Sequence, residues 1–146
     1  MTLYHQQLLK LKKDVYRHDA LYQQIINAKL FIDKHFTENI RLDDMTGKAF
    51  LSKFHFLRLF KDSYGTTPHQ YLTEQRIRKA KQLLRSGMPA TEVCTTVGFE
   101  SISSFTRLFK KMTGTPPSVF QKNSKMKSTP LSPIVIGHCV NSYKRA

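Results

Sequence analysis

Apolar residues recur at intervals of three and four from Ile25 to Phe120, whereas stretches that alternate apolar and polar positions are scarce. Such intervals place apolar side chains on one face of a helix, so the pattern predicts an all-α chain. The first predicted helix carries Ile25, Ala28, Leu30, Phe31, Ile32 and Phe36 and is expected to pack on the elements that follow it. Before it, Leu8, Leu11 and Val15 form a short, basic amphipathic stretch that continues this helix, binds a partner or is a loosely held arm.

The chain contains an internal repeat. The segment FHFLRLFKDSYGTTPHQY at 54–71 aligns without a gap with SSFTRLFKKMTGTPPSVF at 103–120, at an offset of 49 residues. The offset pairs identical residues, among them Phe56 with Phe105, Arg58 with Arg107, Phe60 with Phe109, Gly65 with Gly114 and Pro68 with Pro117. A solenoid needs about three or more stacked repeats. Two copies therefore indicate a duplicated small module.

Each copy has the pattern of a short helix, a tight turn and a second helix that follows a serine cap and ends at a glycine. The residues that set this pattern are Leu42, Met45, Ala49, Ser52, Asp62 and Gly65 in the first copy and Val93, Cys94, Val97, Gly98, Ser101 and Gly114 in the second. We expect an N-terminal helix or arm (1–24), a first helix-turn-helix subdomain (25–67), a linker helix (68–87), a second helix-turn-helix subdomain (88–122) and a C-terminal tail (123–146).

The second helix of each copy is predicted to have an inward and an outward face, as a helix that enters a DNA major groove requires. The predicted inward residues are Phe56, Leu59 and Phe60 in the first copy and Phe105, Leu108, Phe109 and Met112 in the second. The predicted outward residues are Lys53, Phe54, Leu57, Arg58 and Lys61, and Ile102, Ser103, Thr106, Arg107 and Lys110.

The outward residues suit contacts to DNA. Arg58 and Arg107 are the first candidates for sequence readout, because a guanidinium pairs bidentately with guanine and gains roughly 1–3 kcal/mol of discrimination. Phe54 and Leu57 can meet a thymine methyl, with core packing or a protein contact as the alternative. The expected DNA backbone contacts are Lys53, His55, Lys61, Thr106 and Lys110, for which a solvated surface is the alternative.

These motifs resemble the DNA-binding domain of AraC/XylS-type bacterial transcription regulators. The resemblance rests on RLFK at 58–61, GTTPHQY at 65–71 and VGFESISSFTRLFKKMTGTPPSVF at 97–120, and it covers residues 25 to 121. It implies a seven-helix domain that places two recognition helices in successive major grooves, activates transcription and touches RNA polymerase. The family's base-contact positions fall on Phe54, Leu57, Arg58, Ile102, Ser103 and Arg107.

The chain departs from the family pattern at three places. Ala49 stands where the second copy has Gly98, Pro116 replaces the usual threonine, and Phe120-Gln121 replaces a usual Tyr-Arg pair. A side chain in a left-handed turn costs roughly 1 kcal/mol or more, so the first turn is expected to be slightly different or strained. Most family members also carry a sensor domain that is missing here, so the chain is a stand-alone regulator or part of a longer one.

Composition supports a polyanionic partner. The formal net charge is +14, and residues 27–123 carry sixteen basic and eight acidic side chains, so most of the excess lies in the helical region. The two cysteines, Cys94 and Cys139, make a disulfide framework improbable and favour the cytoplasm. We expect no membrane segment, and two unlike recognition helices in one chain favour a monomer on an asymmetric DNA site.

Other classes of function fit the sequence less well. The six histidines have no metal-ligand spacing and no catalytic arrangement or phosphate loop is present, so we expect no enzyme, metal or cofactor. A protein-interaction module or a non-specific architectural DNA-binding protein explains the helices but not the paired arginines. RNA binding fits the charge but lacks an aromatic sheet surface.

Overall fold

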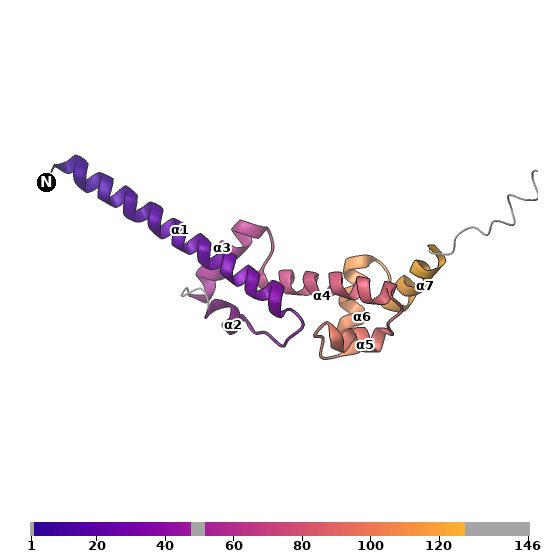
Figure 1. Cartoon of the computed structure of the whole chain (residues 1–146). Helices are drawn as coiled ribbons and strands as arrows, with labels where there is room; N and C mark the ends of the chain where they lie inside the picture. The colour runs from indigo at the N-terminus through magenta and orange to yellow at the C-terminus, as the bar shows by residue number, and fades with distance from the viewer. Residues whose placement is uncertain (1, 48–51, 128–146) are drawn as a thin grey trace, which may run out of the picture. The chain divides into compact units, whose positions relative to one another are not determined.

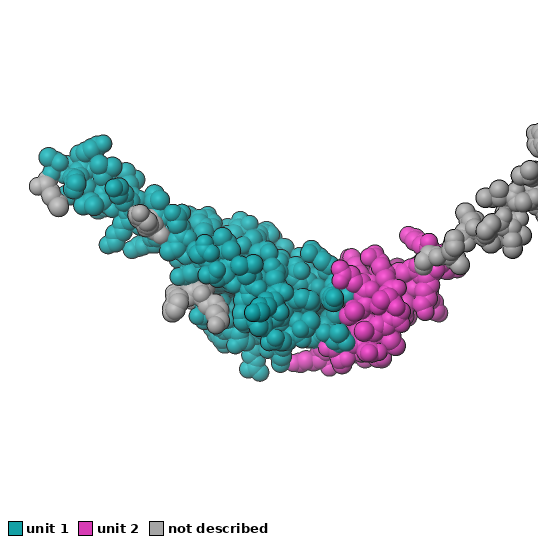
Figure 2. Space-filling view, in the orientation of Figure 1, with its two compact units in different colours: residues 1–79, 96–98 teal, residues 80–95, 99–146 magenta. Residues whose placement is uncertain are grey.

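A computed structural model describes residues 2–47 and 52–127, which form seven helices and no strand (Figure 1). The helices are α1 (Leu3–His35), α2 (Leu42–Thr46), α3 (Lys53–Tyr64), α4 (Pro68–Arg85), α5 (Ala90–Thr96), α6 (Ile102–Thr113) and α7 (Pro117–Lys127). The predicted all-α, seven-helix fold class is therefore confirmed. The chain divides into unit 1 (residues 1–79 and 96–98) and unit 2 (80–95 and 99–146), so α4 contributes to both (Figure 2).

The core of unit 1 is built from one face each of α1, α2, α3 and α4. Its buried residues are Ile25, Ala28, Ile32, Met45, Phe56, Phe60 and Leu72. The ring of Phe60 lies 4.9 Å from Tyr64 and 5.9 Å from Tyr71 between centroids. The prediction that Leu30 packs inward is wrong: its side chain is 56% exposed. The helical period that buries Ala28 and Ile32 places Leu30 on the opposite face of α1.

Polar side chains tie α4 to the end of α1 within unit 1. The Tyr71 hydroxyl donates to Asp33 Oδ1 at 2.5 Å, and Lys29 Nζ donates to Asp33 Oδ2 at 2.8 Å. The hydrogen bond to Asp33 raises the pKa of Lys29 above its ordinary value. Arg76 donates from Nε to the Phe36 carbonyl at 2.7 Å and from Nη2 to the Glu38 carbonyl. These bonds fix the chain at the point where α1 ends.

Gly98 closes the turn after α5 in a conformation that only glycine adopts easily. Its φ is +91°, and a Cβ built on it would lie 2.6 Å from the Thr37 carbonyl oxygen. The backbone of the turn therefore touches the loop after α1 directly, within unit 1. The counterpart in the first copy, Ala49, lies outside the described residues, and so does the predicted difference in its turn.

Both predicted recognition helices begin and end as the sequence indicates. The Ser52 hydroxyl accepts a hydrogen bond from the His55 amide at the start of α3, and the Ser101 hydroxyl accepts one from the Ser104 amide at the start of α6. Gly65 and Gly114 follow the two helices with φ of +74° and +86°. The predicted serine caps and glycine ends are confirmed.

Unit 2 is organised around the inward face of α6. Phe105 and Phe109 are fully buried, and the Phe109 ring meets the Phe120 ring of α7 edge-on at 5.3 Å. Gln121 Nε2 donates to the carbonyls of Leu84 and Met88, which binds α7 to the end of α4. Met112 was predicted to point inward, but it is 40% exposed, because it lies in the last turn of α6 beyond the two buried phenylalanines.

Candidate nucleic-acid interface

The outward face of α3 is a mixed apolar and basic surface. Phe56 and Phe60 anchor the helix to the unit 1 core, which directs the opposite side of α3 to solvent. Phe54 is 86% exposed, Arg58 and Lys61 are exposed, and Leu57 is half-buried. An exposed phenylalanine beside two exposed cations suits a partner that accepts both apolar contact and charge. The major groove of DNA, with its thymine methyl groups and phosphates, is such a partner.

The outward face of α6 repeats this arrangement in unit 2. Phe105 and Phe109 anchor the helix, and Ile102 is 43% exposed on the other side. Ser103, Arg107 and Lys110 are exposed, and Thr106 is half-buried. The face therefore offers hydroxyl groups, an apolar contact and two cations. No other element in the described part of unit 2 covers it.

Arg58 and Arg107 occupy the same position on their two helices, six residues after the serine caps. Neither guanidinium makes a hydrogen bond or ion pair with the described part of the chain. An arginine without an internal acid keeps all five of its N–H donors for a ligand. Lys61 and Lys110 are also exposed and without an acidic partner among the described residues. Their positions correspond as well, so both helices present a like pair of cations.

Two of the predicted backbone contacts have neighbours that the sequence did not reveal. Lys53 Nζ lies 2.5 Å from Asp43 Oδ1 of α2, and both side chains are more than half exposed. Such a surface pair contributes about 0–1 kcal/mol, so a phosphate can replace Asp43 as the partner. His55 lines a depression of about 130 Å³ with Tyr22 and Leu59, so α1 lies beside this part of α3.

Lys111 was overlooked in the sequence analysis. It is exposed in the last turn of α6, four residues after Arg107, and so lies on the same side of the helix. The interval of four from Arg107 was the signal that could have found it. Lys111 extends the basic surface of α6 beyond the residues predicted.

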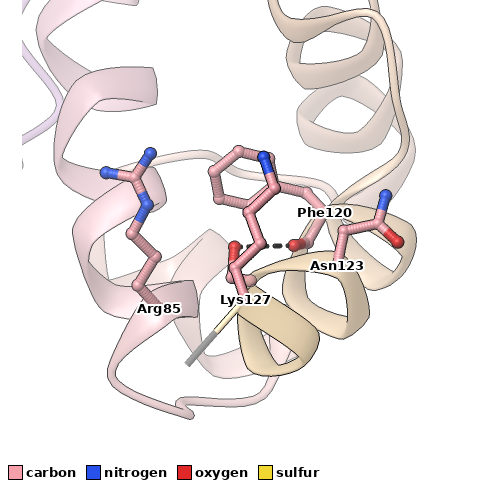
Figure 3. Close-up of a pocket in the computed structure, with 5 residues that line it drawn as sticks. Arg85, Phe120, Asn123 and Lys127 are labelled. Carbon is pink, nitrogen blue, oxygen red and sulfur yellow. Dashed lines mark hydrogen bonds between the residues drawn. The ribbon is translucent and has the colours of Figure 1, made fainter. Parts of the chain in front are cut away.

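A second basic surface lies on unit 2 where α7 meets the end of α4 (Figure 3). It is a hollow of about 480 Å³ lined by Arg85, Phe120, Asn123, Ser124 and Lys127. The Arg85 guanidinium stands 5.3 Å from the centre of the Phe120 ring, and the Ser124 hydroxyl donates to the Phe120 carbonyl. The lining contains no acidic side chain, so the hollow can attract an anionic group but holds no acid–base pair.

The described residues offer no cluster of metal ligands. Within residues 2–47 and 52–127, no three histidine, cysteine, aspartate or glutamate side chains gather as metal ligands. Cys94 is buried and its Sγ contacts the Phe99 carbonyl at 3.8 Å. Burial raises the pKa of the Cys94 thiol, which keeps it protonated and unsuited to act as a nucleophile. Among the described helices, none is both long and apolar enough to cross a membrane.

The chain also matches a known protein family. Residues 45–123 match a family model described as a helix-turn-helix domain. Among curated proteins, the probable transcription factor PqrA of Proteus vulgaris is 37% identical over 93 residues, which cover 63% of this chain and 76% of PqrA. The probable transcriptional regulator LumQ of Photobacterium leiognathi is 36% identical over 92 residues, 62% of this chain, but these span only 37% of LumQ.

Comparison with solved structures gives the same architecture. The C-terminal domain of AraT, a response regulator from Geobacillus stearothermophilus, superposes with a TM-score of 0.67 at 28% sequence identity. The match covers 70% of this chain and 87% of the AraT domain.

Proposed function

This chain belongs to the AraC-type helix-turn-helix family, and from that premise we propose that it is a transcription regulator that reads duplex DNA with α3 and α6. Its helix-turn-helix domain binds double-stranded DNA. Base contacts are assigned to Phe54, Leu57, Arg58, Ile102, Ser103 and Arg107, and backbone contacts to Lys53, His55, Lys61, Thr106, Lys110 and Lys111. We propose that residues 25–67 and 88–122 are the two helix-turn-helix subdomains and that residues 68–87 are the linker helix between them.

The observation that carries the proposal is the pair of arginines without internal partners. Arg58 and Arg107 stand at one register on two helices whose opposite sides are buried by equivalent phenylalanines. A duplicated fold alone would maintain the buried residues, since they fill the two cores. It would not require an uncompensated cation at the same exposed position twice. Reading two guanines in two successive major grooves gives both arginines a role.

One chain is sufficient for one site in this proposal. Two unlike outward faces in the same chain favour an asymmetric DNA sequence, with its two elements roughly one helical turn, about 34–36 Å, apart. We further propose that the bound chain activates transcription by touching RNA polymerase, as the family resemblance implies. Duplex DNA and RNA polymerase share the bacterial cytoplasm, which is therefore the proposed location. RNA polymerase catalyses transcription, and this chain is proposed to catalyse no reaction.

Replacing Phe54 by alanine is expected to weaken DNA binding while leaving stability unchanged. The side chain is 86% exposed, so its loss should alter the free energy of unfolding by less than about 0.5 kcal/mol. If DNA covers the ring, its loss removes about 1.5 kcal/mol or more of apolar burial, which is roughly tenfold in affinity. Fluorescence titration of a duplex containing the selected site measures the affinity, and thermal unfolding measures the stability.

Leu30→Ala is the matched control for Phe54→Ala. Leu30 is also an exposed apolar residue of unit 1, but it lies on α1 and away from the proposed interface. Its replacement should change neither affinity nor stability. Equal losses of affinity in both variants, or an unfolding midpoint lowered by Phe54→Ala, would contradict the proposed position of Phe54 in the groove.

A further inference from the structure

The helix α1 begins far ahead of the first residue that unit 1 buries. The buried residues of α1 start at Ile25, whereas the helix starts at Leu3 (Figure 1). In the intervening stretch, seven large apolar side chains are exposed to solvent. Leu3 (79%) and Leu9 (48%) lie outside the line formed by the other five, whose exposed fractions are 71% for Tyr4, 38% for Leu8, 62% for Leu11, 58% for Val15 and 47% for Tyr22. The stretch is continuous helix, so these side chains have fixed positions relative to one another.

The five residues share one narrow face, here called the α1 seam (Tyr4, Leu8, Leu11, Val15 and Tyr22). They follow at intervals of four, three, four and seven residues, and the core residue Ile25 comes three residues after Tyr22. This is the a and d spacing of a heptad repeat, in which exposed His18 takes the remaining position. The same line of side chains that enters the unit 1 core at Ile25 therefore continues uncovered toward the N-terminus.

We propose that the α1 seam pairs with the α1 seam of a second copy of this chain in a two-stranded coiled coil. A repeat of seven residues matches the geometry of another heptad helix rather than that of a flat surface or a membrane. A surface-lying helix would instead have a wider apolar face with an average period of 3.6 residues. Because the seam is complementary to itself, a second copy supplies the missing partner without any further element.

The charges beside the seam allow this pairing. Residues 3–24 carry four basic and two acidic side chains, so two copies repel each other only weakly. Lys12 and Asp19 border a shallow depression with Leu8, Leu11 and Val15. Both signs of charge therefore flank the apolar residues, and the two acids of a second copy can pair with two of the four bases. No ion pair occurs within this stretch among its described side chains.

The size of the seam sets the strength of the association. Twenty-two residues of helix are about 33 Å long, and an isolated helix of this length is only marginally stable in water. The dimer should therefore dissociate on dilution. Each chain keeps its own asymmetric DNA site, and pairing joins two bound chains, which raises their joint affinity for DNA with two sites.

Sedimentation of the whole chain without DNA, over a range of protein concentrations, tests the pairing. We expect a reversible shift from 17.0 kDa toward twice that mass. Leu11→Glu should weaken the association at least tenfold. Leu9→Glu is the matched control, because Leu9 is exposed to a similar degree on the same helix but lies outside the heptad positions. It should associate like the wild type.

Several results would overturn the pairing. A wild-type chain that stays monomeric at every concentration would do so, and so would equal effects of Leu9→Glu and Leu11→Glu. A truncation after Lys127 that becomes dimeric when the whole chain is not would show that residues 128–146 occupy the seam instead. Circular dichroism and binding to a single DNA site verify that each variant remains folded. Because the readout needs no DNA, failure of the dimer leaves the proposed DNA recognition intact.

Discussion

Replacing Gly98 by alanine is expected to destabilise the chain far more than the same replacement at Gly114. Both glycines have positive φ, +91° and +86°, so both variants bear the cost of a left-handed L-residue, roughly 1–2 kcal/mol. Only at Gly98 does the new Cβ meet backbone, 2.6 Å from the Thr37 carbonyl oxygen, whereas nothing lies within 4 Å at Gly114. Overpacking adds roughly 1–3 kcal/mol, for a total of about 2–5 kcal/mol at Gly98.

Urea denaturation followed by circular dichroism measures this difference between the glycines. Gly87→Ala is a second control, since its φ is +99° and its surroundings are also open. The backbone of Thr37 cannot withdraw easily, because Arg76 holds the neighbouring Phe36 and Glu38 carbonyls. Similar losses of stability in all three variants would show that the turn after α5 does not contact the loop after α1.

DNA affinity is expected to fall by roughly 10³–10⁵ between 50 and 200 mM salt, as it does for proteins that make six to ten phosphate contacts. The physical reason is the release of condensed counterions when lysine and arginine neutralise phosphates. The exposed basic residues of α3 and α6, together with a net charge of +14, supply contacts of this kind. Titration of one duplex at several salt concentrations gives the slope of log affinity against log salt.

A variant that lacks one positive charge tests which lysines cause the dependence of DNA affinity on salt. Lys110→Gln should lower the magnitude of the slope by about 1, because one phosphate contact is lost. Lys34→Gln removes an exposed lysine at the end of α1, outside the assigned interface, and should leave the slope unchanged. An affinity insensitive to salt would instead indicate a hydrophobic protein interface, and a response to Lys34→Gln would place DNA on a different face.

The elements of the fold could be predicted because each leaves a local signal. The serine caps, the glycine ends and the inward phenylalanines of α3 and α6 are set by hydrogen bonds and periodicity within a dozen residues. The offset of 49 residues then made each copy a check on the other. Leu30 and Met112 were misplaced because an apolar residue near a helical stripe, or at a helix end, is buried only if a neighbouring element covers it.

Long-range contacts could not be predicted in the same way. The bonds from Arg76 to the Phe36 and Glu38 carbonyls, and from Gln121 to the Leu84 and Met88 carbonyls, join residues more than thirty positions apart. Nothing in the local sequence distinguishes such a side chain from a solvated one. Gln121 departs from the usual family pattern, and its two hydrogen bonds hold α7 to the end of α4. The role of Leu8, Leu11 and Val15 could not be predicted either. Whether this stretch continues the helix, binds a partner or is a loosely held arm depends on where α1 leaves the core.

Selection from a random duplex pool, with the wild type, Arg58→Ala and Arg107→Ala, tests the central claim most directly. The account predicts an asymmetric site with two elements about one helical turn apart. Each variant should relax a different element, by roughly 1–3 kcal/mol at the base it contacts. If no sequence is enriched while binding remains sensitive to salt, the protein is a non-specific architectural DNA-binding protein. If both variants relax the same element, the readout by two helices is wrong.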